Sequence, residues 1–126
     1  MAAFDAAEHL WSETDLRPED VGTAQLYDGF SMLTLTWLEA LGFCGKGEAK
    51  DFLQGGDNIA REGKLALNTN GGQLSGGRTH GFGYFHEAVL QLKGQAGERQ
   101  LPQRPRVAAV ANGGGPLGSC FLLRTD

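Results

Sequence analysis

The sequence predicts an α/β domain in which helices cover a small sheet. Segments with apolar residues at helical spacing alternate with short apolar runs of strand length, a pattern typical of layered α/β structures. Two further apolar runs close the chain and are joined by glycines and Pro116, as in a hairpin. The 126 residues suit one domain, which we expect to span residues 1–126.

The first part of the chain predicts a helix, a turn and a strand. Apolar residues at helical spacing predict a helix over 3–12. Residues 15–20 have the composition of a turn, in which Pro18 favours a short helical segment. Residues 24–28 are expected to form a short strand.

A second helix is predicted over 31–41, capped by Ser31 and ended by Gly42. It is apolar on nearly every face, so we expect it to be central. The following stretch, about 44–66, mixes glycine with charged residues. It predicts a long loop excursion with one helical turn at 49–53.

The last third of the chain predicts a strand, a helix and the closing hairpin. A short strand over 65–68 leads into a glycine-rich loop, and a third helix begins near residue 81. Residues 94–106 are expected to form a solvated loop before the strands 106–111 and 119–124. The apolar face of the third helix is predicted to consist of Phe82, Phe85, Val89 and Leu92.

Composition and charge exclude several classes of partner and site. A net charge of −4 argues against broad electrostatic binding to nucleic acid or to anionic membranes. No apolar run approaches the roughly 18 residues of a membrane span. Cys44 and Cys120 have no metal or redox spacing, so we expect no metal site and a reducing, cytoplasmic location.

Glycine is the unusual feature of the composition. The chain has 20 glycines in 126 residues, more than twice the usual share of roughly 7%. They gather at 71–83 and 113–118. Glycine permits positive φ angles and close approach of a ligand to the backbone, so these loops predict a site built from main-chain amides.

The first glycine loop also matches a phosphate-binding pattern in part. Residues 72–79 follow G-x-x-x-x-G-K-[ST], except that Arg78 stands where the lysine is required. A forked guanidinium does not replace a compact ammonium at the β- and γ-phosphates. We therefore do not expect a nucleotide site.

Three motifs together resemble the C-terminal half of a thiolase-superfamily protein. They are the Asn68–Gly72 loop followed by Gly77 and Gly81, the Ala111–Gly115 triglycine segment, and the 25–31 segment between a strand and a helix. The resemblance implies a mixed sheet between helix layers and a site for a coenzyme A thioester that is not bound covalently. The residues expected to bind it are Asn68, Gly71, Gly72, Gly77, Asn112, Gly113 and Gly114.

The positions that carry thiolase catalysis are changed. By the register of the motifs, the family's catalytic histidine falls on Arg78, its acid–base cysteine on Ala111 and its oxyanion-hole asparagine on Tyr27. The nucleophilic cysteine belongs to the N-terminal half, which this sequence does not contain. Ordinary thiolase chemistry needs a thiolate and its acid–base partners, so we do not expect it.

Two strings are similar to one branch of the superfamily, the thiolase-like lipid-transfer proteins of bacterial steroid side-chain degradation. The strings are 77–84, Gly-Arg-Thr-His-Gly-Phe-Gly-Tyr, and 112–116, Asn-Gly-Gly-Gly-Pro. The resemblance implies a retro-aldolase that cleaves a β-hydroxyacyl-CoA and works with a zinc-ribbon and OB-fold partner protein.

A retro-aldol reaction needs a base for the β-hydroxyl proton and an oxyanion hole, but no nucleophile. The only tyrosines, Tyr27 and Tyr84, lie in the motif segments, so we expect them to be the acid–base groups. A free tyrosine has a pKa near ~10, so a nearby cation must lower it, and Arg78 and His80 are the candidates.

Other interpretations remain open at this point. Either tyrosine hydroxyl could simply face solvent, and Arg78 could bridge to a carboxylate such as Asp28. The chain could be a lyase or acyltransferase subunit, a non-catalytic acyl-CoA or lipid-binding module, or a structural half that works only with an N-terminal thiolase half. An isolated half would expose an apolar face, so we expect it to bind that half or to form a homo-oligomer.

Overall fold

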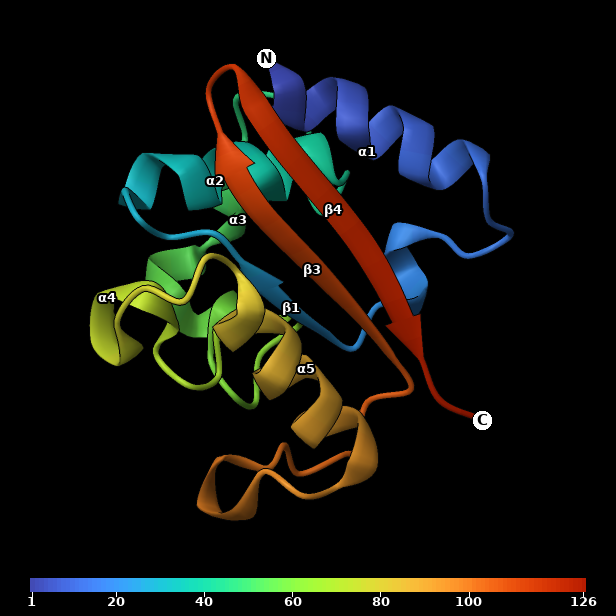
Figure 1. Ribbon diagram of the computed structural model, residues 1–126, viewed down its shortest axis with the longest axis vertical. Helices are drawn as coiled ribbons and strands as arrows, with labels where there is room; N and C mark the ends of the chain where they lie inside the picture. Colours follow the sequence, from blue (N-terminus) through green and yellow to red (C-terminus); the bar gives the residue numbers. More distant parts are fainter.

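The computed structural model describes residues 1–126 (Figure 1). Short 3-10 segments lie at Pro18–Asp20, Gln54–Ile59 and Gly97–Arg99. The helices and strands follow in the order α1 (Ala2–Ser12), β1 (Thr23–Leu26), α2 (Ser31–Ala40), α3 (Ala49–Phe52), β2 (Ala66–Leu67), α4 (Gly72–Gly76), α5 (Phe82–Lys93), β3 (Val107–Gly114) and β4 (Leu117–Arg124).

The four strands form one mixed sheet in the order β2-β1-β3-β4. β1 is parallel to both of its neighbours, whereas β3 and β4 form an antiparallel hairpin. Ala24 of β1 lies opposite Leu67 on one side and Ala109 on the other. The predicted α/β class with a mixed sheet is therefore confirmed.

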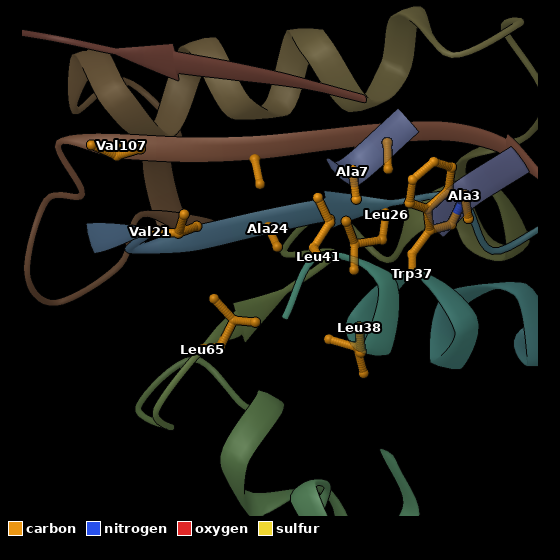
Figure 2. Close-up of a cluster of buried hydrophobic side chains, with 12 residues drawn as sticks. Ala3, Ala7, Val21, Ala24, Leu26, Trp37, Leu38, Leu41, Leu65 and Val107 are labelled. Atoms are coloured by element: carbon orange, nitrogen blue, oxygen red, sulfur yellow. The ribbon is translucent and has the colours of Figure 1, made fainter. Parts of the chain in front are cut away.

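The larger apolar cluster fills the space between the sheet and helices α1 and α2 (Figure 2). Because side chains alternate across a strand, every second residue of β1 and β3 points into this cluster. Trp37 of α2 is fully buried and donates its indole N–H to the Gly113 carbonyl oxygen at 2.9 Å. The cluster consists of Ala3, Ala7, Val21, Ala24, Leu26, Trp37, Leu38, Leu41, Leu65, Val107, Ala109 and Ala111.

Helix α5 covers the opposite face of the sheet. Its Ala88 packs in a second cluster with Ala108 and Val110 of β3, and small side chains on both sides allow the helix to approach closely. Tyr84 and Leu92 complete that cluster. The sheet therefore lies between two helix layers, as the sequence resemblance implied.

The buried face of α5 differs from the predicted one. Phe82 is 74% exposed and Val89 is exposed as well, so of the predicted apolar face only Leu92 and the partly buried Phe85 pack toward the sheet. Two polar residues are buried in its place because hydrogen bonds satisfy them. The buried residues of α5 are Tyr84, Glu87, Ala88, Gln91 and Leu92.

The second helix also departs from its prediction. Met32 is 69% exposed, so α2 is buried along one face rather than on all sides. Ser31 is the first residue of the helix, the capping position is Phe30, and no side chain caps it. The predicted Ser31 cap was therefore wrong.

Several boundaries changed where backbone contacts override local composition. The excursion at 44–66 contains the predicted helical turn as α3, but the loop expected before α5 contains the additional helix α4. β1 ends at Leu26, before the predicted boundary at residue 28. The hairpin is confirmed, and Gly113 and Gly114 belong to β3 because they pair with β4. No helix in the structure has the length and apolar character needed to cross a membrane.

Candidate active site

Three segments meet at the ends of neighbouring strands. β1 and β3 are parallel, so the segment after β1 and the last residues of β3 lie at the same edge of the sheet. The amide of Tyr27 donates to the Ala111 carbonyl oxygen at 3.0 Å, and the Asn112 side chain donates to the His80 carbonyl oxygen at 3.3 Å. The three motif regions singled out in the sequence are thus brought together.

Asn68 connects the first glycine loop to β1. Its side-chain oxygen accepts from the Leu26 amide at 2.7 Å, and its side-chain nitrogen donates to the Leu26 carbonyl oxygen at 2.9 Å. Both ends of the carboxamide are therefore used within the chain. Asn68 therefore fixes the loop to the end of β1.

The glycines of this loop shape the backbone around α4. Gly72 has a φ of 64°, and a Cβ atom there would collide with the carboxylate of Asp28. At Gly81, where φ is 94°, a Cβ atom would collide with the Asn112 side chain. Glycine is required at both positions by conformation and by close approach.

Most of the loop amides expected to bind a ligand are already paired. The amide of Gly71 donates to the Asn68 carbonyl oxygen, that of Gly72 to the Asn70 side chain, and that of Gly77 to the Gln73 carbonyl oxygen. Gly113 and Gly114 lie in the β3–β4 ladder. In contrast, the amides of residues 78–81 make no hydrogen bond within the chain.

A small cavity opens beside these free amides. Its volume is about 60 Å³, enough for a carbonyl-sized group but not for an acyl chain. Tyr84 and Gln73 provide its larger side chains. The complete lining is Asn70, Gly72, Gln73, Gly76, Gly77, Thr79, Gly81, Gly83 and Tyr84.

Tyr84 lies in the first turn of α5, with only 4% of its surface exposed. Its hydroxyl donates to Oδ1 of Asp28 at 2.5 Å and accepts the Asp28 amide at 3.0 Å. Burial and then the hydrogen bond to the Asp28 carboxylate raise the pKa of Tyr84 well above 10.

The sequence suggested Asp28 only as an ion-pair partner for Arg78 and did not predict its contact with Tyr84. Asp28 is 7% exposed, and its carboxylate accepts the Gln73 amide at 2.7 Å as well as the Tyr84 hydroxyl. The same carboxylate lies 3.5 Å from the Leu74 amide at the start of α4. Its position directly after Tyr27, at the end of a buried strand, was the available signal in the sequence.

Tyr27 stands beside this pair. Its ring centroid lies 6.5 Å from that of Tyr84, with a tilt of 54° between the planes. The ring packs against both core clusters, and the hydroxyl lies over Gly29 without a hydrogen-bond partner in the chain. The structure thus brings the two predicted tyrosines together.

Arg78 and His80 do not act on Tyr84 as predicted. Both side chains are exposed and make neither a hydrogen bond nor an ion pair within the chain. The alternative bridge from Arg78 to Asp28 is not formed either. The prediction that these cations lower the pKa of Tyr84 was wrong, because burial and Asp28 raise it.

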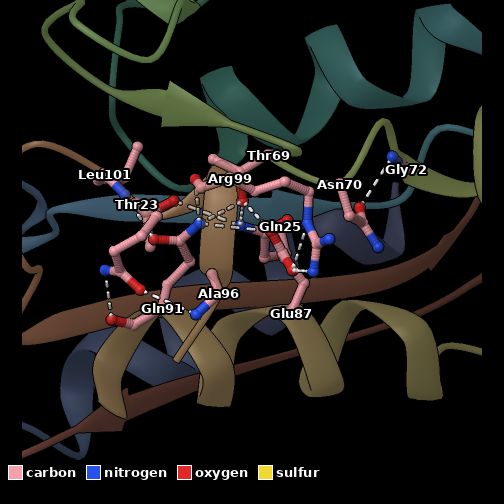
Figure 3. Close-up of polar contacts among 11 residues, drawn as sticks. Thr23, Gln25, Thr69, Asn70, Gly72, Glu87, Gln91, Ala96, Arg99 and Leu101 are labelled. Atoms are coloured by element: carbon pink, nitrogen blue, oxygen red, sulfur yellow. Dashed lines mark hydrogen bonds and ion pairs between the residues drawn. The ribbon is translucent and has the colours of Figure 1, made fainter. Parts of the chain in front are cut away.

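A buried polar network supports the loop from behind (Figure 3). The Thr69 hydroxyl donates to Glu87 at 2.6 Å, and Arg99 donates to the same carboxylate at 2.9 Å. Gln25 of β1 donates to Thr69 at 3.1 Å. Composition had placed Arg99 in a solvated loop, and only the tertiary structure shows that it pairs with α5.

The pKa of Glu87 reflects two opposing effects. Burial alone raises it, but hydrogen bonds from Arg99, Thr69 and Gln91 outweigh burial and hold the pKa below 4.5. Glu87 is therefore an ionised, fully engaged carboxylate. It holds Thr69 in place in the loop, and neither of its oxygens is free to bind a substrate.

No three histidine, cysteine or acidic side chains lie close enough together to hold a metal ion. Both cysteines are free thiols. Burial raises the pKa of Cys120 to about 11, so its thiol stays protonated at neutral pH.

Comparison with known proteins places this arrangement among its relatives. Residues 1–123 match the family described as thiolase C-terminal domain-like. The chain is 53% identical over 85 residues to 17-hydroxy-3-oxo-4-pregnene-20-carboxyl-CoA lyase of Mycobacterium tuberculosis, covering 68% of this chain and 22% of the lyase. It is 46% identical over 115 residues to the steroid side-chain-cleaving aldolase of Thermomonospora curvata, covering 91% of this chain and 29% of the aldolase.

More distant similarity reaches human sterol carrier protein 2, at 36% identity over 109 residues, covering 81% of this chain and 20% of that protein. Among solved structures, the Ltp2-ChsH2(DUF35) aldolase superposes with a TM-score of 0.86 at 37% identity, covering 97% of this chain and 31% of that one. The chain spans less than a third of the length of each of these proteins.

Proposed function

The chain belongs to the thiolase C-terminal domain-like family, and we propose that it forms the C-terminal half-site of a retro-aldolase. The substrate would be a β-hydroxyacyl-CoA thioester with a steroid or other lipid side chain. The names of two relatives, a carboxyl-CoA lyase and a side-chain-cleaving aldolase, support this assignment.

The observation that carries the proposal is the exchange of thiolase groups for a tyrosine–aspartate pair at the cavity. Where thiolases have histidine and cysteine, this chain has the exposed Arg78 and the buried Ala111. Tyr84 lines the cavity and donates to Asp28 at 2.5 Å. Such a site offers proton transfer without a nucleophile, which is the requirement of a retro-aldol cleavage.

The remaining roles follow from the free groups at the site. The unpaired amides of residues 78–81 beside the cavity are suited to stabilise the thioester enolate oxygen. Tyr84 and Tyr27 would be the acid–base groups, and the coenzyme A thioester would bind without a covalent link. The side chains of Arg78 and His80 are exposed in this loop. They would contact the substrate rather than change the pKa of Tyr84.

The rest of the active site would come from other polypeptide. The cavity has a volume of about 60 Å³ and is open to the surface, so most of a coenzyme A thioester would extend beyond it and lie against a second surface. An N-terminal thiolase half, or failing that a second copy of this chain, is the proposed source. A zinc-ribbon and OB-fold protein is a further proposed partner in the cytoplasm, and the two-protein name of the solved aldolase supports it.

The experiment is native mass spectrometry of a tagged chain purified from its own cells, followed by an assay for ketone release from β-hydroxyacyl-CoA thioesters. We expect a complex with an N-terminal thiolase half and cleavage activity. Tyr84→Phe should remove most of that activity, whereas His86→Gln, an exposed change on the same helix, should not. Full activity in Tyr84→Phe would rule out the role of this tyrosine.

A second candidate is a non-catalytic acyl-CoA or lipid-binding module. The similarity to sterol carrier protein 2 and the loss of both thiolase side chains favour it. An assembly that binds thioesters, releases no ketone and is indifferent to changes at Tyr27 and Tyr84 would establish this function instead.

A further inference from the structure

The carboxylate of Asp28 accepts the hydroxyl of Tyr84, which is the one acid–base group that lines the cavity. Asp28 itself is not part of the lining. The Tyr84 hydroxyl donates to Asp28 Oδ1 across 2.5 Å and accepts the main-chain amide of Asp28 at 3.0 Å, and the side-chain oxygen of Gln73 lies 3.2 Å from the same hydroxyl. Because the Gln73 oxygen is an acceptor, the second lone pair of the tyrosine oxygen is left as the position at which a substrate hydroxyl can donate.

We propose that Asp28 is the proton acceptor of the cleavage and that Tyr84 relays the proton to it. The inference rests on the proposed function, because it assigns the base of that same reaction. Tyr84 is then the catalytic residue that contacts substrate, and Asp28 acts through it.

The step balances without a co-reactant. The β-hydroxyl proton passes to the Tyr84 oxygen while the tyrosine's own proton passes to Asp28 Oδ1. The electron pair of the broken O–H bond forms the new carbonyl group, the C–C bond breaks, and its electron pair moves to the α-carbon as a thioester enolate. The proton then returns from Asp28 through Tyr84 to that carbon, which restores the site.

The other charged groups near the site do not compete for this role. Arg78 and His80 are exposed and make no contact with the pair, and Glu87 is held by Arg99 and Thr69. The raised pKa keeps the Tyr84 hydroxyl protonated, so Tyr84 can take a substrate proton only if it passes its own proton on, and the carboxylate bonded to it is the acceptor.

Asp28→Asn in the assembled enzyme is the first test. The variant keeps the size of the side chain but removes its capacity to take the proton. We expect kcat to fall by about 10²–10⁴-fold, the range of general acid–base catalysis, with a small change in KM. Because the two groups act in series, adding Tyr84→Phe should cause little further loss. Asp51→Asn, an exposed change far along the chain, should leave kcat unaltered.

Chemical rescue separates proton transfer from a purely structural role. In Asp28→Ala, added formate should restore activity, whereas formamide, which is neutral and nearly the same shape, should not. Restoration by both compounds, or additive losses in the double variant, would show that Asp28 only positions the loop.

If neither variant assembles, a solvent isotope measurement on the wild-type assembly tests the relay. The relay moves two protons in one step. A plot of the cleavage rate against the deuterium fraction of the solvent should therefore be curved, and a straight line would overturn the relay. Failure of the wild-type assembly to cleave any thioester would overturn the proposed function itself. Activity retained in Asp28→Asn would overturn the relay alone.

Discussion

Single side chains in this domain take their roles from their surroundings. Asp28 and Glu87 are both buried carboxylates, but Asp28 accepts a tyrosine hydroxyl and the amide of Gln73 in α4, whereas Glu87 is held by an arginine. Arg99 and Arg78 are both loop arginines, yet only Arg99 has a buried partner. A buried charged group must be paired, so the partner decides which of these residues is structural.

Glu87→Gln is expected to change how stability depends on pH. The pKa of Glu87 is lower in the folded chain than in the unfolded one, so its stabilisation is present above about pH 4.5 and is lost as the pH falls through the folded value. The variant should lose about 1–3 kcal/mol of unfolding free energy at pH 7, and its stability should fall less on acidification. Urea unfolding from neutral pH down to about pH 3 measures both effects.

Glu62→Gln is the matched control for that experiment. Glu62 is 73% exposed and lies 4.0 Å from Arg61, so its pair contributes little. Its stability should stay within about 0.5 kcal/mol of the wild type, with the same acid dependence. If both variants lost stability equally slowly on acidification, the net charge of the chain, and not the buried Glu87–Arg99 pair, would set the pH dependence.

Helix α4 and the turns around it are the element that builds the site. Positive φ angles at Gly71, Gly72 and Gly77 bend the backbone before and after this short helix. Asp28, from the neighbouring strand end, accepts the amide of Gln73 near the start of the helix. A helix of five residues has little stability of its own, so contacts with Asp28 and with α5 hold it.

Gly72→Ala should destabilise this element, whereas Gly76→Ala should not. At Gly72 the φ angle is positive and a Cβ atom would collide with Asp28, while at Gly76 a Cβ atom meets nothing within 4 Å. We expect a loss of about 1–3 kcal/mol for Gly72→Ala. For Gly76→Ala we expect a change of less than about 1 kcal/mol, of either sign. Thermal unfolding of both variants measures the difference, and equal stabilities would contradict the proposed close approach.

At the scale of the whole molecule, the domain exposes several large apolar side chains on its surface. Phe82 on α5 is exposed, and Phe85 packs on the partly exposed Phe121 of β4 with ring centroids 5.1 Å apart. We call these three residues the aromatic patch. Exposed aromatic groups of this kind are typical of interaction surfaces.

The purified chain is therefore expected to associate, either with itself or with a second polypeptide, and to bind an apolar dye. Phe82→Ser should reduce both effects because it removes the most exposed ring of the aromatic patch, whereas His86→Ser, also exposed on α5, should not. Sedimentation velocity over a wide concentration range, with dye fluorescence, measures this. A dilute, dye-free monomer would contradict the expectation.

Much of the architecture followed from local pattern. Helical spacing located α1, α2 and α5, strand-length apolar runs located the hairpin, and motif spacing identified the family before any contact was known. Local pattern could not predict α4, because a glycine-rich run has no helical preference of its own. It also misassigned the buried face of α5, since Glu87 and Gln91 are buried only through partners distant in sequence.

By itself, the sequence determined the α/β class and the order of the main elements, because these features depend on spacing and composition, which are local properties. That Tyr27 and Tyr84 share one site was expected only from the resemblance of their segments to the family's motifs. Only the tertiary structure decided that Tyr84 donates to Asp28, that Arg78 and His80 stand apart, and that most glycine amides are already paired. Burial and hydrogen-bond partners arise from residues far apart in the chain, and they set the pKa values and the free groups on which the chemistry depends.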